Sequence, residues 1–230
     1  QLQRVGMVLT YGGGDPVVYG YRALGVEHCI PVYNALDPST HHPVAADERF
    51  AADLSFLGNR LPDREARVET FCLEVARVLP DKRFLLGGSG WGDKPMAQNV
   101  DYVGHVATRD HNAFNASPLA VLNISRQSMA DTGFSPATRV FEAAGAAACL
   151  ITDAWPGLEG FLEDGKEVLV ARDGQDVAEI LGWLTPTAAR RIGALAKARV
   201  LKDHTYSRRA REVDALLRQA GARQAAFVTA

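Results

Sequence analysis

Residues 133–153 have the sequence GFSPATRVFEAAGAAACLITD, which predicts a helix near residues 137–144 followed directly by a strand near residues 148–152. The helical part carries apolar residues at helical spacing and ends in small residues, which allow close packing. The strand part is a continuous apolar run, as expected when helices cover both faces of a sheet. A helix that leads straight into a buried strand is typical of a parallel α/β architecture.

The start of this helix is a candidate anion site. Ser135 precedes Pro136, and a capping hydroxyl followed by proline is a typical helix start. The first backbone N–H groups and the positive end of the helix dipole favour a bound anion there. Arg139 and Glu142 are three residues apart and share one face. They form either a solvated ion pair or part of a site, and the small residues at 143–147 favour the site.

The same alternation extends outward over the rest of the chain. The predicted strands cover residues 54–57, 83–86, 101–103, 119–123, 148–152 and 167–170. The predicted helices cover residues 109–115, 137–144, 157–162 and a helical tail at 176–220 with breaks near Pro186 and His204. Asp63 is a predicted N-cap of a further helix whose apolar face carries Val68, Phe71, Cys72, Val75 and Leu79. This pattern predicts a Rossmann-like parallel sheet with helices on both faces.

The N-terminal part is organised differently. Apolar runs at residues 5–11 and 28–33 flank a glycine turn and a predicted helix at 16–24. Residues 34–47 are rich in Asn, Asp, Pro, Ser, Thr and His, which is typical of a linker. We therefore predict a domain boundary near residue 45.

Composition excludes several classes of function. The 230 residues carry 25 Lys and Arg against 27 Asp and Glu, which argues against a nucleic-acid binder or a polybasic membrane anchor. No run of 18 apolar residues is present, so no membrane span is predicted. Cys29, Cys72 and Cys149 lie in apolar runs without CxxC spacing, which predicts neither a zinc site nor a disulfide framework. A cytoplasmic protein is expected.

The glycine turns argue against two common nucleotide sites. Gly12 and Gly14 are followed by Val17 where a dinucleotide fingerprint needs its third glycine, and the turn that ends at Gly90 likewise has Asp93 there. No GxxxxGK[ST] loop and no Tyr-x-x-x-Lys pair are present. An NAD-dependent enzyme or a P-loop protein is therefore disfavoured.

The carboxyl ends of the predicted strands carry the other candidate ligand contacts, because ligands of parallel sheets bind at that edge. Arg126 follows one strand and Arg60 another, so with the helix start they are candidates to neutralise a diphosphate. Glu142, one turn further along, is a candidate to accept hydrogen bonds from ribose hydroxyls. His105 follows Gly104 at the same edge, whereas His41 and His42 are adjacent and are not expected to share a metal.

This set of motifs resembles the C-terminal domain of GT-B glycosyltransferases, most closely the spore-maturation CgeB-like group. The matching residues are Ser135-Pro136, Thr138-Arg139, Phe141-Glu142-Ala143, Leu150, Thr152-Asp153, Leu158-Glu159, Phe161 and Gly165-Lys166-Glu167. Further similarity lies at residues 56–59, 103–105 and 204–206, so the resemblance covers residues 50–220.

The resemblance implies a nucleotide-sugar site in a Rossmann-like domain at residues 46–230. Residues 1–45 would be the end of an N-terminal Rossmann-like domain and its linker. Glu142 would hold the donor ribose. The implied donor-binding set is Gly58, Asn59, Arg60, Gly104, His105, Asn123, Arg126, Ser135, Thr138, Arg139 and Glu142. Within that set, residues 135–138 and Arg126 would contact the diphosphate, residues 103–106 the base, and residues 58–60 would lie beneath the phosphates.

Two departures from the family pattern limit the prediction. Phe134 stands eight residues before Glu142, where the EX7E motif has its first glutamate. The chain begins Gln1-Leu2-Gln3, and residues 1–33 resemble only the last β-α-β piece of an N-terminal domain. We therefore expect most of the acceptor-binding half to be missing, and no general base is assigned.

The leading prediction is a bacterial, cytoplasmic glycosyltransferase of hexosyltransferase type. It would transfer a sugar from a nucleotide-diphosphate-sugar donor to an unknown acceptor, with no metal and no cofactor. Two alternatives stay open: a non-catalytic module that binds nucleotides or sugar phosphates, and a nucleotide-sugar epimerase of the GT-B fold.

Overall fold

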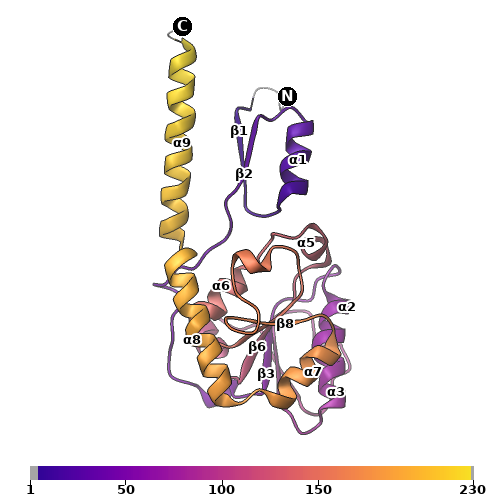
Figure 1. The fold of residues 1–230 in the computed structure, drawn as a ribbon. Coiled ribbons are helices and arrows are strands. Elements are labelled where there is room, and N and C mark those ends of the chain that lie inside the picture. The colour runs from indigo at the N-terminus through magenta and orange to yellow at the C-terminus, as the bar shows by residue number, and fades with distance from the viewer. Residues whose placement is uncertain (1–4, 229–230) are drawn as a thin grey trace.

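The computed structural model describes residues 5–228, with side chains to residue 220, and these residues form two sheets (Figure 1). The small sheet pairs β1 (Met7–Thr10) with β2 (His28–Pro31) in parallel, and α1 (Asp15–Ala23) connects them. The larger sheet follows after residue 45. The domain boundary that the sequence predicts there stays a prediction.

The larger sheet has six strands in the described part of the chain, and every pairing is parallel. Its strands are β3 (Leu54–Leu57), β4 (Phe84–Gly87), β5 (Val100–Gly104), β6 (Ala120–Asn123), β7 (Leu150–Asp153) and β8 (Leu169–Ala171). Their order is β5-β4-β3-β6-β7-β8. The order reverses between β3 and β6, which makes this edge the topological switch point of a Rossmann-like sheet. The predicted parallel α/β fold is confirmed.

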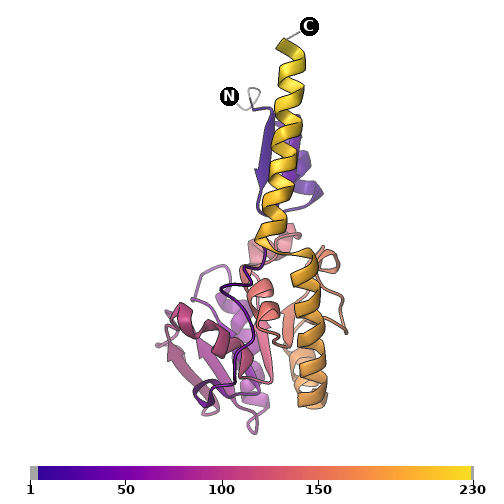
Figure 2. The ribbon, with the colours of Figure 1, turned by 90° about the vertical axis from the view of Figure 1, so that its left-hand side faces the viewer.

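Helices connect the strands of this sheet and continue the chain after its last strand. They are α2 (Glu65–Val68), a π-helical segment (Glu69–Leu73), α3 (Glu74–Val78), α4 (His111–Ala116), α5 (Gln127–Thr132), α6 (Thr138–Gly145), α7 (Gly174–Trp183), α8 (Pro186–Asp203) and α9 (Tyr206–Val228). Figure 2 shows α9 rising from the larger sheet alongside the small one. The tail breaks at Pro186 and His204 as predicted. The helix predicted at 157–162 is only the single 3-10 turn Leu158–Gly160, and α5 is not predicted by the sequence.

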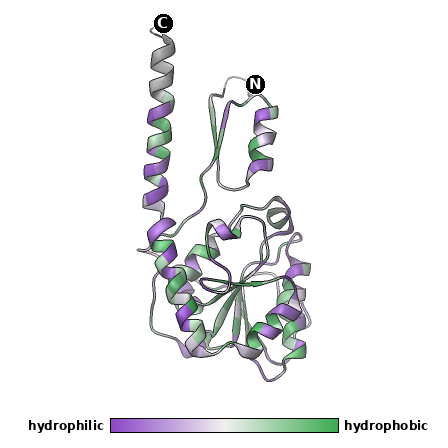
Figure 3. Ribbon diagram, viewed as in Figure 1, coloured by the Kyte–Doolittle hydropathy of each residue, from purple (hydrophilic) through white to green (hydrophobic). Residues whose placement is uncertain are grey.

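Strands β3, β4, β6 and β7 are buried at every position, as their apolar sequences predict, whereas the edge strand β5 has exposed residues. Figure 3 shows the hydrophobic residues gathered along the central strands of this sheet. Leu122 and Ile151 pack with α3 and α7 in one cluster, and Val121 and Leu150 pack with α6 and α8 in another. Neighbouring residues of one strand point to opposite faces, so one continuous apolar run fills both clusters.

Both predicted helix caps are wrong, because tertiary contacts use the capping groups. The helix predicted to follow Asp63 begins at Glu65 with Arg64 as its N-cap, while Asp63 accepts a hydrogen bond from the Ser128 hydroxyl (3.2 Å). Helix α6 begins at Thr138 with Ala137 as its N-cap. The hydroxyl of Ser135 instead accepts a hydrogen bond from the backbone N–H of Gly13 (3.0 Å) in the small sheet's connecting turn.

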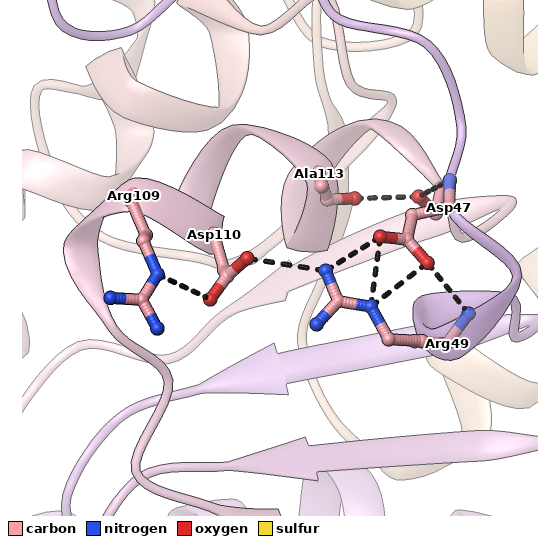
Figure 4. Close-up of polar contacts among 6 residues, drawn as sticks. Asp47, Arg49, Arg109, Asp110 and Ala113 are labelled. Carbon is pink, nitrogen blue, oxygen red and sulfur yellow. Dashed lines mark hydrogen bonds and ion pairs between the residues drawn. The ribbon is translucent and has the colours of Figure 1, made fainter.

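Hydrogen bonds and ion pairs hold the linker between the two sheets at both of its ends. Leu36 exchanges backbone hydrogen bonds with His204 and Tyr206 at the start of α9. At the other end Arg49 bridges the carboxylates of Asp47 and Asp110 (Figure 4). The linker is thereby held along α4 and α6, next to the edge of the larger sheet.

His204, at the start of this junction, makes the stability of the folded state depend on pH. Its ring is buried against both Phe141 and Phe161 and accepts a hydrogen bond from Arg209 (3.0 Å). Burial, with the nearby Arg209 charge, lowers the pKa of His204 to about 4. As pH falls below the ordinary histidine pKa of about 6.5, the unfolded chain takes up the proton first, so the folded state loses stability until about pH 4.

We expect the free energy of unfolding to fall by about 1 to 2 kcal/mol between pH 7.5 and pH 5 from this residue alone. Urea unfolding at both pH values, on the wild type and on His204→Gln, measures it. The variant should lose this part of the pH dependence. His42→Gln, at an exposed position, is the control and should keep it. Equal pH dependence in all three proteins would contradict the assignment.

Candidate functional site

The candidate site lies at the carboxyl ends of β3 and β6, on either side of the switch point. The loop after β3 carries Gly58, Asn59 and Arg60, and the loop after β6 leads to Arg126. Helix α6 begins beyond that loop and brings Arg139 and Glu142.

Three arginines gather at this edge. Arg64 is the N-cap of α2, Arg126 is the N-cap of α5, and Arg139 is the second residue of α6. Burial lowers the pKa of Arg64, and repulsion from Arg126 adds to the effect. Burial also lowers the pKa of Arg139 to about 10, with a further contribution from Arg64. The guanidinium groups are thus close enough to repel one another, which destabilises the site when nothing is bound.

Two of these guanidinium groups present unused donors. Nε of Arg64 and Nη1 of Arg139 are buried without a hydrogen-bond partner among the described residues. A different nitrogen of the Arg64 guanidinium group, Nη2, donates a hydrogen bond to the carbonyl oxygen of Asn59 (2.5 Å) and holds the side chain in place. Buried donors without acceptors are costly, and clustered arginines are the usual receptors of phosphate oxygens. The arrangement is suited to a multiply charged anion.

Glu142 is the carboxylate beside this cluster. It interacts electrostatically with Arg139, and His41 of the linker approaches it to 4.0 Å between Nε2 and Oε1. The ring of His41 stacks on that of His111, with centroids 6.4 Å apart. His111 Nε2 lies 3.2 Å from the carbonyl oxygen of Val106, which belongs to the segment 103–106 that is predicted to contact a base. Burial lowers the pKa of His111.

A buried network holds the loop that carries Arg126. Asp153, at the end of β7, is completely buried and accepts hydrogen bonds from Arg67 Nη2 (2.6 Å) and from the backbone N–H of Ser125 (3.1 Å). The amide of Asn123 donates to the hydroxyl of Thr152 (3.0 Å) within the same network. These contacts fix the position of the residue that follows Ser125.

The loop after β3 is fixed by close packing against the loop after β4. Trp91 is fully buried and donates from Nε1 to the carbonyl of Gly58 (2.7 Å). Gly88 has φ +115° and passes so close that an added Cβ would lie 2.3 Å from that carbonyl oxygen. A side chain at position 88 would therefore displace the loop.

The structure separates the predicted site residues into groups. It brings Arg126, Arg139 and Glu142 to one edge, where Arg64 contacts the loop of Gly58 and Asn59. Arg60 lies in ion pairs with Glu65 (2.7 Å) and Asp93 (2.8 Å), which balance its charge.

The other predicted residues differ in exposure. Asn123 is buried and uses its amide on Thr152, and Ser135 is engaged by Gly13. Gly104 is half-buried, whereas His105 and Thr138 are exposed. Whether any of these contacts a donor stays a prediction.

Sequence reasoning missed Arg64 and His41. Arg64 follows Arg60 and Asp63 in the same loop-to-helix segment, so its position next to the predicted cap is the sequence signal that points to it. His41 lies 101 positions before Glu142, so only the path of the linker brings the two together.

The family model described as "Glycosyl transferase-like" matches residues 64–215, about two thirds of the chain. The chain belongs to this glycosyl transferase-like family. The match begins at Arg64 and includes α6 with Arg139 and Glu142, so most of the candidate site lies within it.

Solved structures of low sequence identity share the fold, which is that of GT-B glycosyltransferase domains. Sucrose-phosphate synthase from Thermosynechococcus elongatus is similar with a TM-score of 0.71 at 16% identity, over 96% of this chain and 60% of that one. HepE from Anabaena, in complex with UDP-glucose, has a TM-score of 0.70 at 13% identity, over 93% and 64%. AviGT4, a glycosyltransferase of avilamycin A biosynthesis, has a TM-score of 0.58 at 21% identity, over 88% and 57%.

The chain therefore spans about three fifths of the length of these structures. No curated protein matches the sequence. Within residues 5–228 no helix is both long and apolar enough to cross a bilayer. The described residues also contain no group of three or more His, Cys, Asp or Glu side chains placed to hold a metal ion.

Proposed function

We propose that this chain binds a nucleotide-diphosphate sugar at the switch point and transfers its sugar to an acceptor. The arginine cluster of Arg64, Arg126 and Arg139 carries the proposal. Arg64 and Arg139 have buried donors without a partner among the described residues, Arg126 is exposed and acts on Arg64, and like charges gathered in this way are suited to a diphosphate. Membership in the glycosyl transferase-like family supports the same chemistry.

In this proposal the diphosphate lies against the arginine cluster, and the ribose hydroxyls donate to the Glu142 carboxylate. The loop of residues 103–106, next to His111, would face the base. As the glycosidic bond breaks, negative charge grows on the leaving diphosphate. Preorganised guanidinium groups in a partly dehydrated site stabilise that charge more in the transition state than in the ground state.

Several finer features belong to the same proposal. The transfer would be of hexosyltransferase type and metal-independent, with arginines in place of a cation, and the chain would belong to the CgeB-like group. Three buried free thiols, Cys29, Cys72 and Cys149, suit a reducing compartment such as the cytoplasm. The acceptor and the general base are not assigned, since the chain spans only part of the length of its structural neighbours.

Thermal-shift titration with UDP, GDP, dTDP, ADP and NAD tests the proposal. One nucleoside diphosphate, at about 100 times its dissociation constant, should raise the free energy of unfolding by about 2.7 kcal/mol. Glu142→Ala should reduce this stabilisation. Incubation of the corresponding nucleotide sugar with candidate acceptors, followed by product analysis, separates transfer from epimerisation and from binding alone. Stabilisation by NAD alone would contradict the proposal.

A further inference from the structure

The linker lies directly on helix α6 at the candidate site. Gly145 is the last residue of α6, and an added Cβ there would lie 2.4 Å from the Leu36 side chain and 3.0 Å from the His41 carbonyl. Leu36 is buried in the same apolar cluster as Phe141 of that helix. A residue without a side chain at position 145 thus lets the linker approach the helix that carries Arg139 and Glu142.

His41 is the linker residue that reaches the site. Its side chain is 13% exposed, with Nε2 at 4.0 Å from Oε1 of Glu142. The opposite ring nitrogen, Nδ1, is buried without a hydrogen-bond partner among the described residues. The groups that face this ring are His111 from α4, Glu142 from α6 and, more weakly, Asp37 of the linker itself. Burying an imidazole with an unpartnered nitrogen is costly, so packing alone does not explain the residue.

His41 lies where it can affect the interaction between Glu142 and Arg139. Arg139 attracts the Glu142 carboxylate, and a carboxylate drawn onto this guanidinium would compete with the bound diphosphate. The His41 imidazole, with Nε2 4.0 Å from Oε1 of Glu142, is a second polar neighbour of the carboxylate that competes with this attraction. With Glu142 shared by the two groups, the arginine keeps donors for an anion and the carboxylate keeps acceptors for hydroxyl groups.

We propose that His41 is a positioning residue that holds Glu142 for the ribose hydroxyls of the donor, so that the linker completes the nucleotide site. This inference rests on the proposed function and adds to it a residue from outside the matched family region. It predicts that loss of His41 weakens the recognition of ribose specifically, and leaves contacts with the diphosphate and base unchanged.

The experiment compares a ribonucleoside diphosphate with its 2′-deoxy counterpart by isothermal titration calorimetry. The ligand is whichever of UDP, GDP and ADP binds the wild type most tightly. The wild type should prefer the ribonucleotide by about tenfold, the scale of one hydrogen bond to a charged group. His41→Ala should lose most of this preference, with unchanged affinity for the deoxynucleotide, and His41→Gln should retain part of it. The control His42→Gln alters the exposed neighbouring histidine and should keep the full preference.

A double-mutant cycle with Glu142→Gln separates positioning from general stability. If His41 acts through Glu142, adding His41→Ala to Glu142→Gln should cause no further loss of ribose preference. An undiminished preference in His41→Ala would overturn the inference while leaving the proposed function intact. Equal losses for both nucleotides, or additive effects in the cycle, would also overturn it. No binding of any of the three nucleoside diphosphates to the wild type would overturn the proposed function as well.

Discussion

Replacing Arg139 with methionine is expected to make the free protein more stable and the nucleotide complex much weaker. Burial and the nearby Arg64 hold the pKa of Arg139 at about 10, below its ordinary value near 12.5. A folded-state pKa below the unfolded value means that the positive charge itself destabilises the fold. Removing the charge while keeping a long apolar side chain should raise the free energy of unfolding by roughly 1 to 3 kcal/mol.

The same substitution removes a donor that the proposed diphosphate would use. Hydrogen bonds to charged groups contribute about 1.5 to 3 kcal/mol, so affinity for the nucleoside diphosphate should fall about 10- to 100-fold. Urea unfolding and calorimetric titration measure the two effects on one preparation. Arg190→Met is a matched control, because Arg190 is an exposed arginine of α8. Neither quantity should change there. A less stable Arg139→Met protein with undiminished affinity would show that Arg139 is a structural residue.

Replacing Asp153 with alanine is expected to cause a large loss of stability. The carboxylate is completely buried and accepts from Arg67 and from the backbone N–H of Ser125. Burial outweighs these contacts and raises the pKa of Asp153, so the intact pair contributes little net stability. Removing the carboxylate is different, because it leaves the half-buried Arg67 guanidinium and the buried N–H of Ser125 without this acceptor. We expect a loss of about 3 to 5 kcal/mol in the free energy of unfolding.

Two further variants test whether the loss of stability comes from the unpaired charge. Asp214→Ala removes a carboxylate from an exposed pair with Arg218, and it should change stability by less than about 1 kcal/mol. The double variant Asp153→Leu with Arg67→Met should be clearly more stable than Asp153→Ala, since no unpaired charge remains. A small effect of Asp153→Ala alone would mean that water satisfies Arg67 and Ser125, and that the network does not fix the Arg126 loop.

The strands and their direction could be predicted from the sequence because each depends on neighbouring residues. The run at β3 is predicted with its observed bounds, and the apolar sequence of β7 predicts burial on both faces. Arg139 and Glu142 are three residues apart, so helical geometry alone puts them on one face. The carboxyl-edge location of the site follows from the parallel sheet.

The two N-cap predictions failed because each capping group forms its hydrogen bond with a residue far away in the sequence. The Ser135 hydroxyl has the pattern of a cap, yet a backbone N–H 122 positions away in the chain uses it. Helix α6 therefore begins two residues later than a cap at Ser135 and Pro136 requires. Asp63 similarly meets Ser128 from the next loop instead of capping α2. A local motif supplies a hydrogen-bonding group but does not choose its partner.

By itself the sequence determined the alternation of strands and helices, the parallel sheet and the placement of Arg139 and Glu142 on one helix face. Hydrophobic periodicity and helix geometry act over a few residues, and these features need nothing more. Only the tertiary structure decided that Arg64 joins Arg126 and Arg139, that Glu65 and Asp93 balance the charge of Arg60, and that His41 faces Glu142. These features depend on chain segments far apart in sequence meeting at the switch point, where burial and charge are set by the neighbours that the fold supplies.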